Sequence, residues 1–343
     1  MSPSSAASAR SAPLRFAFNL DRRRLDQCFI PETIGAIARL VDLDREVPEQ
    51  LTDEWLRPRL ADADGVITGW GSLPLTAERL AAAPRLRYAI HSAGSVKPFV
   101  TDALWRRGMR VTSAANVNGR PVAQFVLGLL FACLKDVFRY QAEFKRDGRG
   151  AWKRGPHIAG YYRTTVGVIG AGNVGRELLR FLQPHDFRVL VHDPLLDEET
   201  ARSLGAERAE LDTLLRESRA VVLVAPNIVE NRHLIGAAQL ALLQDGAYFI
   251  NPGRGALVDH DALIAELQTG RITACLDVTE PEPPPEGSPL YTLPNCVLTP
   301  HVAGSLNDEC LRLGEQVLEE ITRLVEGRPF ENEVTEEALR RMG

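Results

Sequence analysis

The sequence predicts an α/β protein built on two parallel, doubly wound sheets. Short apolar runs alternate with helical patterns, which is typical of strands joined by crossover helices. The alternation starts near Leu14 and restarts at Thr165. The runs of the second series are almost continuously apolar, as expected where helices cover both faces of a sheet. The length of 343 residues also fits two domains, because a domain averages roughly 150 residues.

The first series follows residues 1–13, a Ser- and Ala-rich stretch without an apolar core. Such a stretch does not resemble a secretory signal, and we expect a disordered tail. Apolar runs then predict strands at Leu14–Phe18, Gly65–Thr68, Leu86–Ile90 and Met109–Thr112. Helical patterns between them predict helices at Glu32–Leu40, Leu51–Leu60 and Phe99–Gly108.

The second series contains six apolar runs that predict strands. They are Thr165–Gly170, Phe187–Asp193, Ala220–Ala225, Ala247–Asn251, Ile272–Val278 and Cys296–Pro300. A long helix over 121–146, with Pro121 in its first turn, and a polar arm over 147–163 precede this series. An amphipathic helix over 306–326, ended by Gly327, closes it.

The overall composition excludes several classes of partner and site. Forty Lys and Arg against 45 Asp and Glu give a net charge of −5, so we expect no nucleic-acid partner. The longest apolar stretch, Phe125–Leu134, is shorter than the roughly 20 residues that cross a bilayer, so we expect no membrane partner. Five scattered cysteines favour reduced thiols in a cytoplasmic protein. No His, Asp or Glu cluster has metal-ligand spacing, so no metal is expected.

A glycine-rich turn follows the strand at Thr165–Gly170 and opens the helical pattern Val174–Leu182. It matches G-x-G-x-x-G, with Gly170, Ala171, Gly172, Asn173, Val174 and Gly175 in the six positions. Glycines allow the backbone to approach a pyrophosphate, whose charge is met by free N–H groups at the helix start. The context predicts a dinucleotide site.

An acidic residue at the end of the next strand decides which dinucleotide is preferred. Asp193 ends this strand, 18 residues after Gly175. A carboxylate there accepts hydrogen bonds from ribose hydroxyls and repels a 2′-phosphate, so we expect NAD rather than NADP. Arg176 or Arg188 could soften this preference.

Three ionisable residues stand after strands of the second series, at the edge where open α/β sheets bind ligands. They are Arg254, Glu282 and His301. A guanidinium can hold a carboxylate through paired N–H bonds, and an imidazole can exchange a proton with an alkoxide. A carboxylate beside the imidazole orients it and favours its protonated form. Taken singly, Arg254 could instead form a surface ion pair and Glu282 could be a solvated loop charge. His301 could be a histidine at a strand end whose hydrogen bonds are satisfied.

Over nearly its whole length, from Leu14 to the C-terminal helix, the chain resembles the D-isomer-specific 2-hydroxyacid dehydrogenases. The matching segments are VGVIGAGNVG, VHDP, VAPNIVENRHLI, FINPGRGALVD, CLDVTEPEP and LTPHVAG. The resemblance implies substrate binding for Arg254, acid–base catalysis for His301 and a partner role for Glu282. It also implies that cofactor contacts come from Ala225, Pro226, Asn227, Asp277 and Gly304, and that Asn118 lies near the active site.

The substrate loop departs from the family pattern. The segment is Ser92-Ala93-Gly94-Ser95-Val96-Lys97-Pro98, and we expect the Gly94 and Ser95 amides to bind the substrate carboxylate. Lys97 replaces the usual acid, and Gln124 replaces the usual Glu. These changes leave the substrate open among glyoxylate, hydroxypyruvate and bulkier 2-keto acids. Phosphoglycerate is less favoured, because few cations besides Lys97 are available for a phosphate.

By resemblance, the fold comprises two Rossmann-like domains, and the substrate domain is discontinuous. Residues 14–116 and 302–343 would form the substrate domain and residues 117–301 the NAD-binding domain. The long helix and the arm commonly form a dimer interface in this family, so a homodimer is expected.

The predicted function is NAD-dependent interconversion of a small D-2-hydroxy acid and its 2-keto acid. One alternative is an enzyme of this fold that acts on formate or phosphite, although formate oxidation needs no acid–base pair. The other is an NAD(H)-sensing binding protein, similar to the corepressors built on this fold, which keep the same residues.

Overall fold

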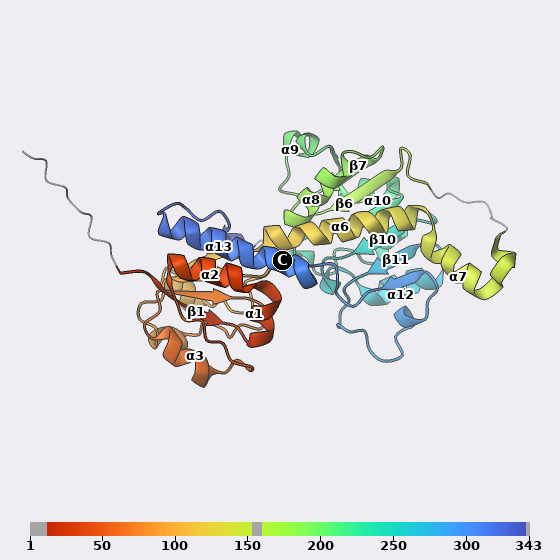
Figure 1. Cartoon of the computed structure of the whole chain (residues 1–343). Helices are drawn as coiled ribbons and strands as arrows, with labels where there is room; N and C mark the ends of the chain where they lie inside the picture. Colours follow the sequence, from red (N-terminus) through yellow and green to blue (C-terminus); the bar gives the residue numbers. More distant parts are fainter. Residues whose placement is uncertain (1–11, 153–159, 341–343) are drawn as a thin grey trace, which may run out of the picture. The chain divides into compact units, whose positions relative to one another are not determined.

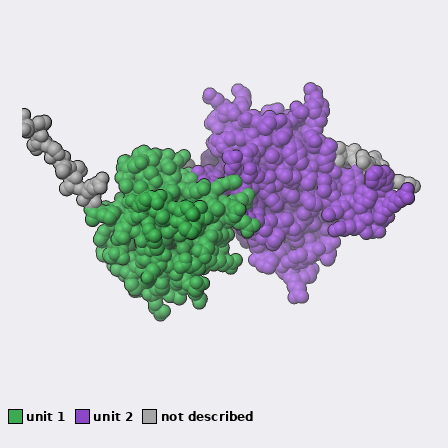
Figure 2. Space-filling model, viewed as in Figure 1, with its two compact units in different colours: residues 1–114, 307–339 green, residues 115–306, 340–343 purple. Residues whose placement is uncertain are grey.

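The computed structural model describes residues 12–152 and 160–340. The chain divides into two compact units, coloured separately in Figure 2 and traced in Figure 1. Unit 1 comprises Met1–Ala114 and Asn307–Leu339, and unit 2 comprises Ala115–Leu306 and Arg340–Gly343. Most of the predicted tail 1–13, the middle of the predicted arm 147–163 and the last three residues lie outside the described residues.

Unit 1 is built on a six-stranded sheet in the order β13-β5-β4-β3-β1-β2. The strands are β1 Arg15–Asn19, β2 Asp42–Leu43, β3 Gly65–Thr68, β4 Tyr88–His91, β5 Arg110–Thr112 and β13 Glu333–Val334. Only β13 runs antiparallel to its neighbour. The four predicted strands are present, and the two additions, β2 and β13, are two-residue edge strands too short to leave a periodic pattern.

Helices also form in unit 1, and several of them begin at side-chain caps. They are α1 Arg22–Cys28, α2 Pro31–Leu40, α3 Asp53–Leu60, α4 Ala77–Ala81, α5 Asp102–Arg106, η5 Asn307–Cys310, α13 Leu311–Val325 and α14 Glu336–Arg340. Thr52, Thr76 and Thr101 start α3, α4 and α5, because each hydroxyl accepts the backbone N–H three residues on. The last long helix, α13, packs against α1 and α2, so the end of the chain returns to unit 1.

Unit 2 is built on a seven-stranded sheet in the order β12-β11-β10-β9-β6-β7-β8. The strands are β6 Thr165–Ile169, β7 Arg188–His192, β8 Glu207–Arg208, β9 Ala220–Leu223, β10 Tyr248–Asn251, β11 Thr273–Leu276 and β12 Cys296–Leu298. Every pairing is parallel. The strand order reverses at β6 and β9, which places a topological switch point beside the glycine-rich turn.

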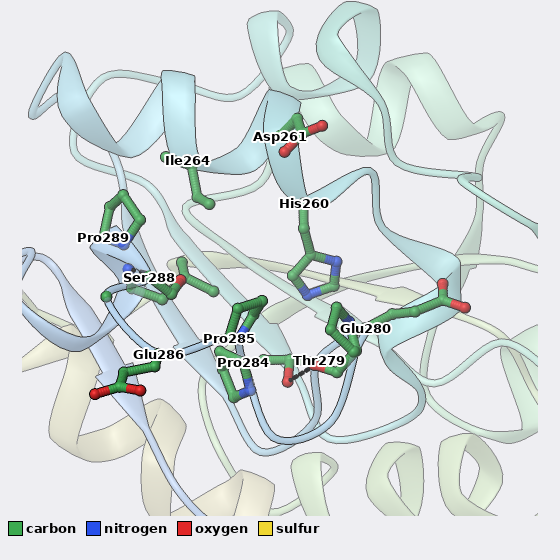
Figure 3. A pocket seen from close by; sticks show the side chains of 13 residues that line it. His260, Asp261, Ile264, Thr279, Glu280, Pro284, Pro285, Glu286, Ser288 and Pro289 are labelled. Atoms are coloured by element: carbon green, nitrogen blue, oxygen red, sulfur yellow. Dashed lines mark hydrogen bonds between the residues drawn. The ribbon is translucent and has the colours of Figure 1, made fainter.

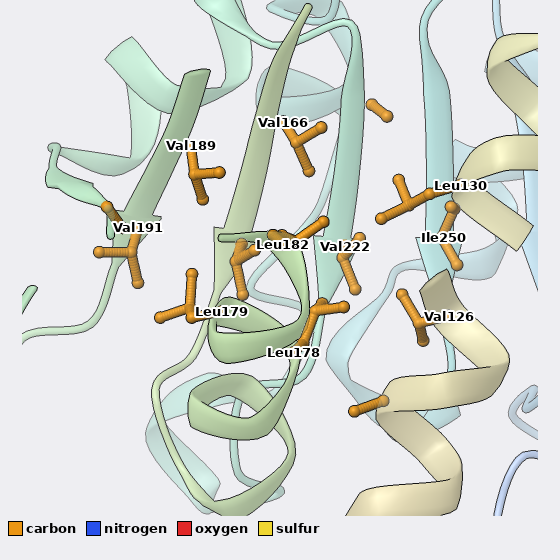
Figure 4. Packing of buried hydrophobic residues seen from close by; sticks show 14 of the residues in the cluster. Val126, Leu130, Val166, Leu178, Leu179, Leu182, Val189, Val191, Val222 and Ile250 are labelled. Atoms are coloured by element: carbon orange, nitrogen blue, oxygen red, sulfur yellow. The ribbon is translucent and has the colours of Figure 1, made fainter. Parts of the chain in front are cut away.

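Both faces of this sheet are covered, as the apolar strands predict. The α-helices are α6 Ala115–Leu134, α7 Val137–Asp147, α8 Asn173–Leu182, α9 Glu198–Ser203, α10 Leu211–Glu217, α11 Ala237–Ala241 and α12 His260–Gln268. Alternate strand residues face opposite clusters. Val166 and Val222 pack with α6 and α8 in one core, as Figure 4 shows, and Val221 packs with α10, α11 and α12 in the other.

The predicted single helix over 121–146 is wrong. The chain forms α6, which begins six residues earlier, and a separate α7. The break falls at Asp136, whose φ of 54° is left-handed and interrupts a right-handed helix. Asp136 accepts a hydrogen bond from the hydroxyl of Tyr248 on β10, so a tertiary contact fixes the break. Pro121 lies inside α6, where it lacks the hydrogen bond to Val117.

Among the described residues, α6 is long and apolar enough to cross a membrane by length and composition alone. The uninterrupted apolar stretch Phe125–Leu134 covers only the second half of α6. Eight residues of α6 are buried, and the helix packs against α8 and the sheet. A buried core helix meets the same criterion of length and composition, so the finding is weak evidence for a membrane span.

Candidate active site

The glycine-rich turn between β6 and α8 is closed on its sheet side and open on its outer side. Gly170 has a φ of +101°, and a Cβ there would lie 2.6 Å from the backbone of Ala225. A Cβ on Gly175 would lie 2.1 Å from the carbonyl oxygen of Gly170. A Cβ on Gly172 would meet no described atom within 4 Å. The turn therefore leaves space for a ligand on the side that Gly172 faces.

The start of α8 carries unpaired donors in that space. Gly172 caps the helix without a side-chain hydrogen bond. The amides of Gly172, Asn173 and Val174 donate to no group in the described part of the chain. Free N–H groups and the helix dipole at an N-terminus favour an anion. The turn therefore fits a dinucleotide pyrophosphate.

Asp193, which follows β7, lies against the same turn. Its Oδ2 accepts the amide of Ala171 at 2.7 Å, and its Oδ1 accepts the amide of Leu195 at 2.9 Å. Each oxygen keeps a lone pair that a ribose hydroxyl can use.

The two arginines that could soften the NAD preference have other partners. Arg188 forms ion pairs with Glu207 at 2.9 Å and Glu217 at 2.7 Å. The Nε of Arg176 donates to the Ala171 carbonyl at 2.9 Å.

Arg254, Glu282 and His301 follow three adjacent strands, β10, β11 and β12. The Nδ1 of His301 lies 2.7 Å from Oε1 of Glu282, and the two side chains are 48% and 42% exposed. Burial lowers the pKa of Arg254, and the nearby Glu282 carboxylate opposes that shift. The three ionisable groups therefore lie together at one edge of the unit 2 sheet, with an accessible imidazole.

Asp277 anchors the segment that carries His301. Its side chain is buried, and its Oδ1 accepts the Thr299 hydroxyl at 2.5 Å and the Val302 amide at 2.9 Å. Its Oδ2 accepts the Ala303 amide at 2.9 Å. His301 itself has a φ of 55°, a conformation that is uncommon for a residue with a Cβ and is held by surrounding contacts. The sequence carries no periodic signal for this anchoring.

Other residues implied as cofactor contacts lie around the same sheet edge. Ala225, Pro226 and Asn227 follow β9, the strand next to β6. The side chain of Asn118 accepts the Ser305 amide at 3.1 Å, and a Cβ on Gly304 would lie 3.4 Å from Asn118.

The predicted carboxylate-binding residues Gly94 and Ser95 follow β4 in unit 1. Both are half-buried, and their amides donate to no group among residues 12–152 and 160–340. Two free amides at the end of a strand suit a carboxylate.

Known proteins match this arrangement. The family described as "D-isomer specific 2-hydroxyacid dehydrogenase, NAD binding domain" matches residues 127–303. The chain belongs to the D-isomer-specific 2-hydroxyacid dehydrogenase family. The match identifies NAD as the cofactor, in agreement with the open glycine turn and Asp193.

The proteins that are similar to this chain carry several names. A glyoxylate reductase from Korarchaeum cryptofilum is 33% identical over 82% of this chain and 86% of its own length. A D-3-phosphoglycerate dehydrogenase from Methanocaldococcus jannaschii is 31% identical over 84% of this chain and 55% of its own length. The chain thus spans about half of the phosphoglycerate dehydrogenases that it matches. The structure of a phosphoglycerate oxidoreductase from Rhizobium etli superposes with a TM-score of 0.75 and 27% identity, covering 94% of this chain and 98% of that one.

A cavity of about 300 Å³ lies in unit 2 of this dehydrogenase-family chain, between the start of α12 and the loop after β11 (Figure 3). His260 and Glu280 line it, whereas Glu282 and His301 do not. The Thr279 hydroxyl donates to the Pro281 carbonyl at 2.8 Å and shapes the turn that leads to Glu282.

In the described residues, no group of three or more His, Cys, Asp or Glu side chains is arranged to hold a metal ion.

Proposed function

We propose that this chain is an NAD-dependent oxidoreductase that interconverts a small D-2-hydroxy acid and its 2-keto acid. The observation that carries the proposal is the pair formed by His301 and Glu282, 2.7 Å apart, with Arg254 after the adjacent strand. A glyoxylate reductase among the relatives supports a small keto acid as substrate.

In this proposal, His301 moves the proton. Bound NAD supplies the carbon that accepts or donates the hydride. In this proposal Nδ1–H of His301 donates a hydrogen bond to the Glu282 carboxylate, which leaves Nε2 to face the substrate oxygen. In the reductive direction, Nε2–H gives a proton to the forming alkoxide, and in the oxidative direction Nε2 takes it back.

Arg254 and the Gly94–Ser95 loop bind the substrate carboxylate in the proposed reaction. A guanidinium keeps its charge in proteins and offers paired N–H donors that match a carboxylate. The two unpaired amides of Gly94 and Ser95 supply further donors.

A panel of 2-keto acids tests the proposal. Glyoxylate, hydroxypyruvate, pyruvate and bulkier 2-keto acids are each mixed with the protein and either NADH or NADPH, and absorbance at the nicotinamide band is followed. We expect NADH-dependent reduction of at least one acid to the D-hydroxy product. Tight NADH binding without turnover of any acid would contradict the proposal and favour an NAD(H) sensor.

We also propose a cytoplasmic homodimer that associates through α7 and the segment after it. No residue of α7 is buried, and Val137, Phe144, Trp152 and Tyr162 are exposed. Exposed apolar side chains gathered on one segment favour a protein partner. Light scattering of the full chain and of the Phe144→Asp variant tests it. A wild-type monomer at micromolar concentration would contradict it.

A further inference from the structure

Asn251, the last residue of β10, immediately precedes the turn that carries Arg254. Its main chain is fixed inside the unit 2 sheet, where it pairs with Leu276 on β11 and its carbonyl accepts the Asp277 amide at 3.0 Å. Its side chain is fully buried. A side-chain amide at this depth needs hydrogen-bond partners for its polar atoms.

Both polar atoms of the Asn251 side chain contact the main chain of that turn. Its Oδ1 accepts the Gly253 amide at 3.0 Å, and its Nδ2 donates to the Arg254 carbonyl at 3.0 Å. The first contact holds the peptide before Gly253, and the second holds the peptide after Arg254. The peptide that joins Gly253 to Arg254 is therefore held from both sides.

This held peptide in turn orients the Arg254 side chain. The Gly253 carbonyl accepts Nη1 of the guanidinium at 2.8 Å. The Nε and Nη2 atoms of Arg254 donate to no group in the described part of the chain. A carboxylate binds such a guanidinium edge through two parallel N–H bonds. Three hydrogen bonds thus connect a buried residue of the sheet to the guanidinium edge that is left for a ligand.

Backbone packing limits the path of the turn but does not orient its peptides. A Cβ on Gly253 would lie 3.0 Å from the Leu223 carbonyl oxygen, and a Cβ on Gly255 would lie 2.0 Å from the backbone of Thr279. These contacts are close but not directional, whereas a hydrogen bond sets the direction of the C=O or N–H that makes it. The direction of the Gly253 carbonyl therefore depends on the Asn251 side chain.

We infer that Asn251 is a positioning residue for substrate binding: its side chain orients the Gly253 carbonyl, which holds Arg254 with the Nε–Nη2 edge directed to the substrate carboxylate. The inference rests on the proposed function, which gives Arg254 the carboxylate. It assigns part of the affinity for the 2-keto acid to a buried amide that does not itself touch the substrate.

Two variants of Asn251 and one matched control test this role. Asn251→Ala removes both hydrogen bonds. Asn251→Ser removes the bond to the Arg254 carbonyl and keeps a weaker form of the other, because a serine hydroxyl can accept the amide two residues on. This milder variant also serves if Asn251→Ala does not fold.

The matched control is Asn295→Ala. The Asn295 side chain also makes two hydrogen bonds to backbone, to the carbonyls of Leu267 at 2.9 Å and Ile272 at 2.7 Å. It precedes β12, however, and so lies at the opposite edge of the same sheet. Asn295→Ala and Asn251→Ala should both lower the midpoint of urea unfolding, but Asn295→Ala should leave KM unchanged.

We expect Asn251→Ala to raise KM for the best 2-keto acid about tenfold and Asn251→Ser to raise it about threefold, with little change in kcat. A carboxylate contact is made equally in the ground and transition states, so its loss changes KM alone. The Kd of oxamate, an unreactive keto acid analogue, should rise in parallel with KM.

A double-mutant cycle shows whether the effect passes through Arg254. Arg254→Ala alone should lower kcat/KM about 100-fold, as expected for the loss of two charged hydrogen bonds. Adding Asn251→Ala to this variant should lower kcat/KM by less than about threefold more, because the group that Asn251 positions is gone.

Three results would overturn the inference. An unchanged KM in the Asn251 variants would show that Arg254 keeps its place without this amide. An equal rise in KM in Asn295→Ala would show a general effect of lost stability. A loss from Asn251→Ala that is as large without Arg254 as with it would show that Asn251 acts on another group. Failure of the proposed function is distinguishable from all three, because wild-type protein would then reduce no 2-keto acid.

Discussion

The Nδ1 atom of His301 lies 2.7 Å from Oε1 of Glu282, although the two residues belong to loops that follow different strands. This pair places one ring nitrogen against a carboxylate and leaves the other for a substrate. Both side chains are about half exposed, so the imidazole is accessible from solvent.

Replacing Glu282 by Gln should slow keto acid reduction about 100-fold, the lower end of the 10²- to 10⁴-fold that a positioned acid–base group contributes. The amide can no longer stabilise the imidazolium. The measurement is kcat/KM with NADH and the best keto acid. Glu286→Gln, an exposed change in the same loop, serves as the control and should keep wild-type activity. Equal activity of the two variants would show that Glu282 takes no part in the mechanism.

Replacing Asp193 by Ala should raise the ratio of kcat/KM with NADPH to that with NADH by at least about tenfold, or about 1.4 kcal/mol. The substitution removes the acceptor for the ribose hydroxyls and the repulsion of a 2′-phosphate. Asp197→Asn, which changes the exposed cap of α9, is the matched control. A ratio that stays constant in Asp193→Ala would show that another group selects the cofactor.

Replacing Asp277 by Asn should reduce both stability and kcat. The carboxylate accepts three hydrogen bonds from Thr299, Val302 and Ala303, and an amide cannot accept all of them because its nitrogen only donates. We expect a loss of about 2 kcal/mol in the free energy of unfolding, measured in urea. Since the same segment holds His301, kcat should also fall. An unchanged kcat would show that His301 keeps its place without this anchor.

Acid should destabilise unit 1 through His91. Burial lowers the pKa of His91 from 6.5 to about 3 in the folded chain. At any pH between these two pKa values, the unfolded chain therefore binds more protons than the folded chain. The contribution of His91 to the free energy of unfolding is therefore complete above about pH 6.5. It falls by about 1.4 kcal/mol per pH unit below that pH. Urea unfolding of wild type and His91→Gln at pH 7 and pH 5 isolates this contribution, because other groups titrate equally in both. A difference in stability between the two proteins that does not vary with pH would contradict a neutral His91.

The strands and the dinucleotide turn are predictable because local patterns determine them. The four apolar or small residues Gly65–Thr68 predict β3 with its observed limits. In the turn, Gly170 is required by its packing against Ala225 and Gly175 by its packing against the Gly170 carbonyl. The helix break at Asp136 is not predictable in this way, because it depends on Tyr248 from a distant strand.

The same distinction applies to the site. Arg254, Glu282 and His301 are recognisable because each follows a predicted strand. The anchoring by Asp277 depends on backbone amides of another loop, and the role proposed for Asn251 depends on backbone partners in the turn after β10. Backbone partners leave no periodic signal in a sequence.

The most direct test of the proposed chemistry compares His301→Ala with wild type in NADH-dependent reduction of the best keto acid. Fluorescence titration measures the Kd of NADH in parallel. The proposed mechanism predicts a fall in kcat of at least about 100-fold with an unchanged Kd of NADH. Near-full turnover by His301→Ala, with NADH bound as in wild type, would contradict it.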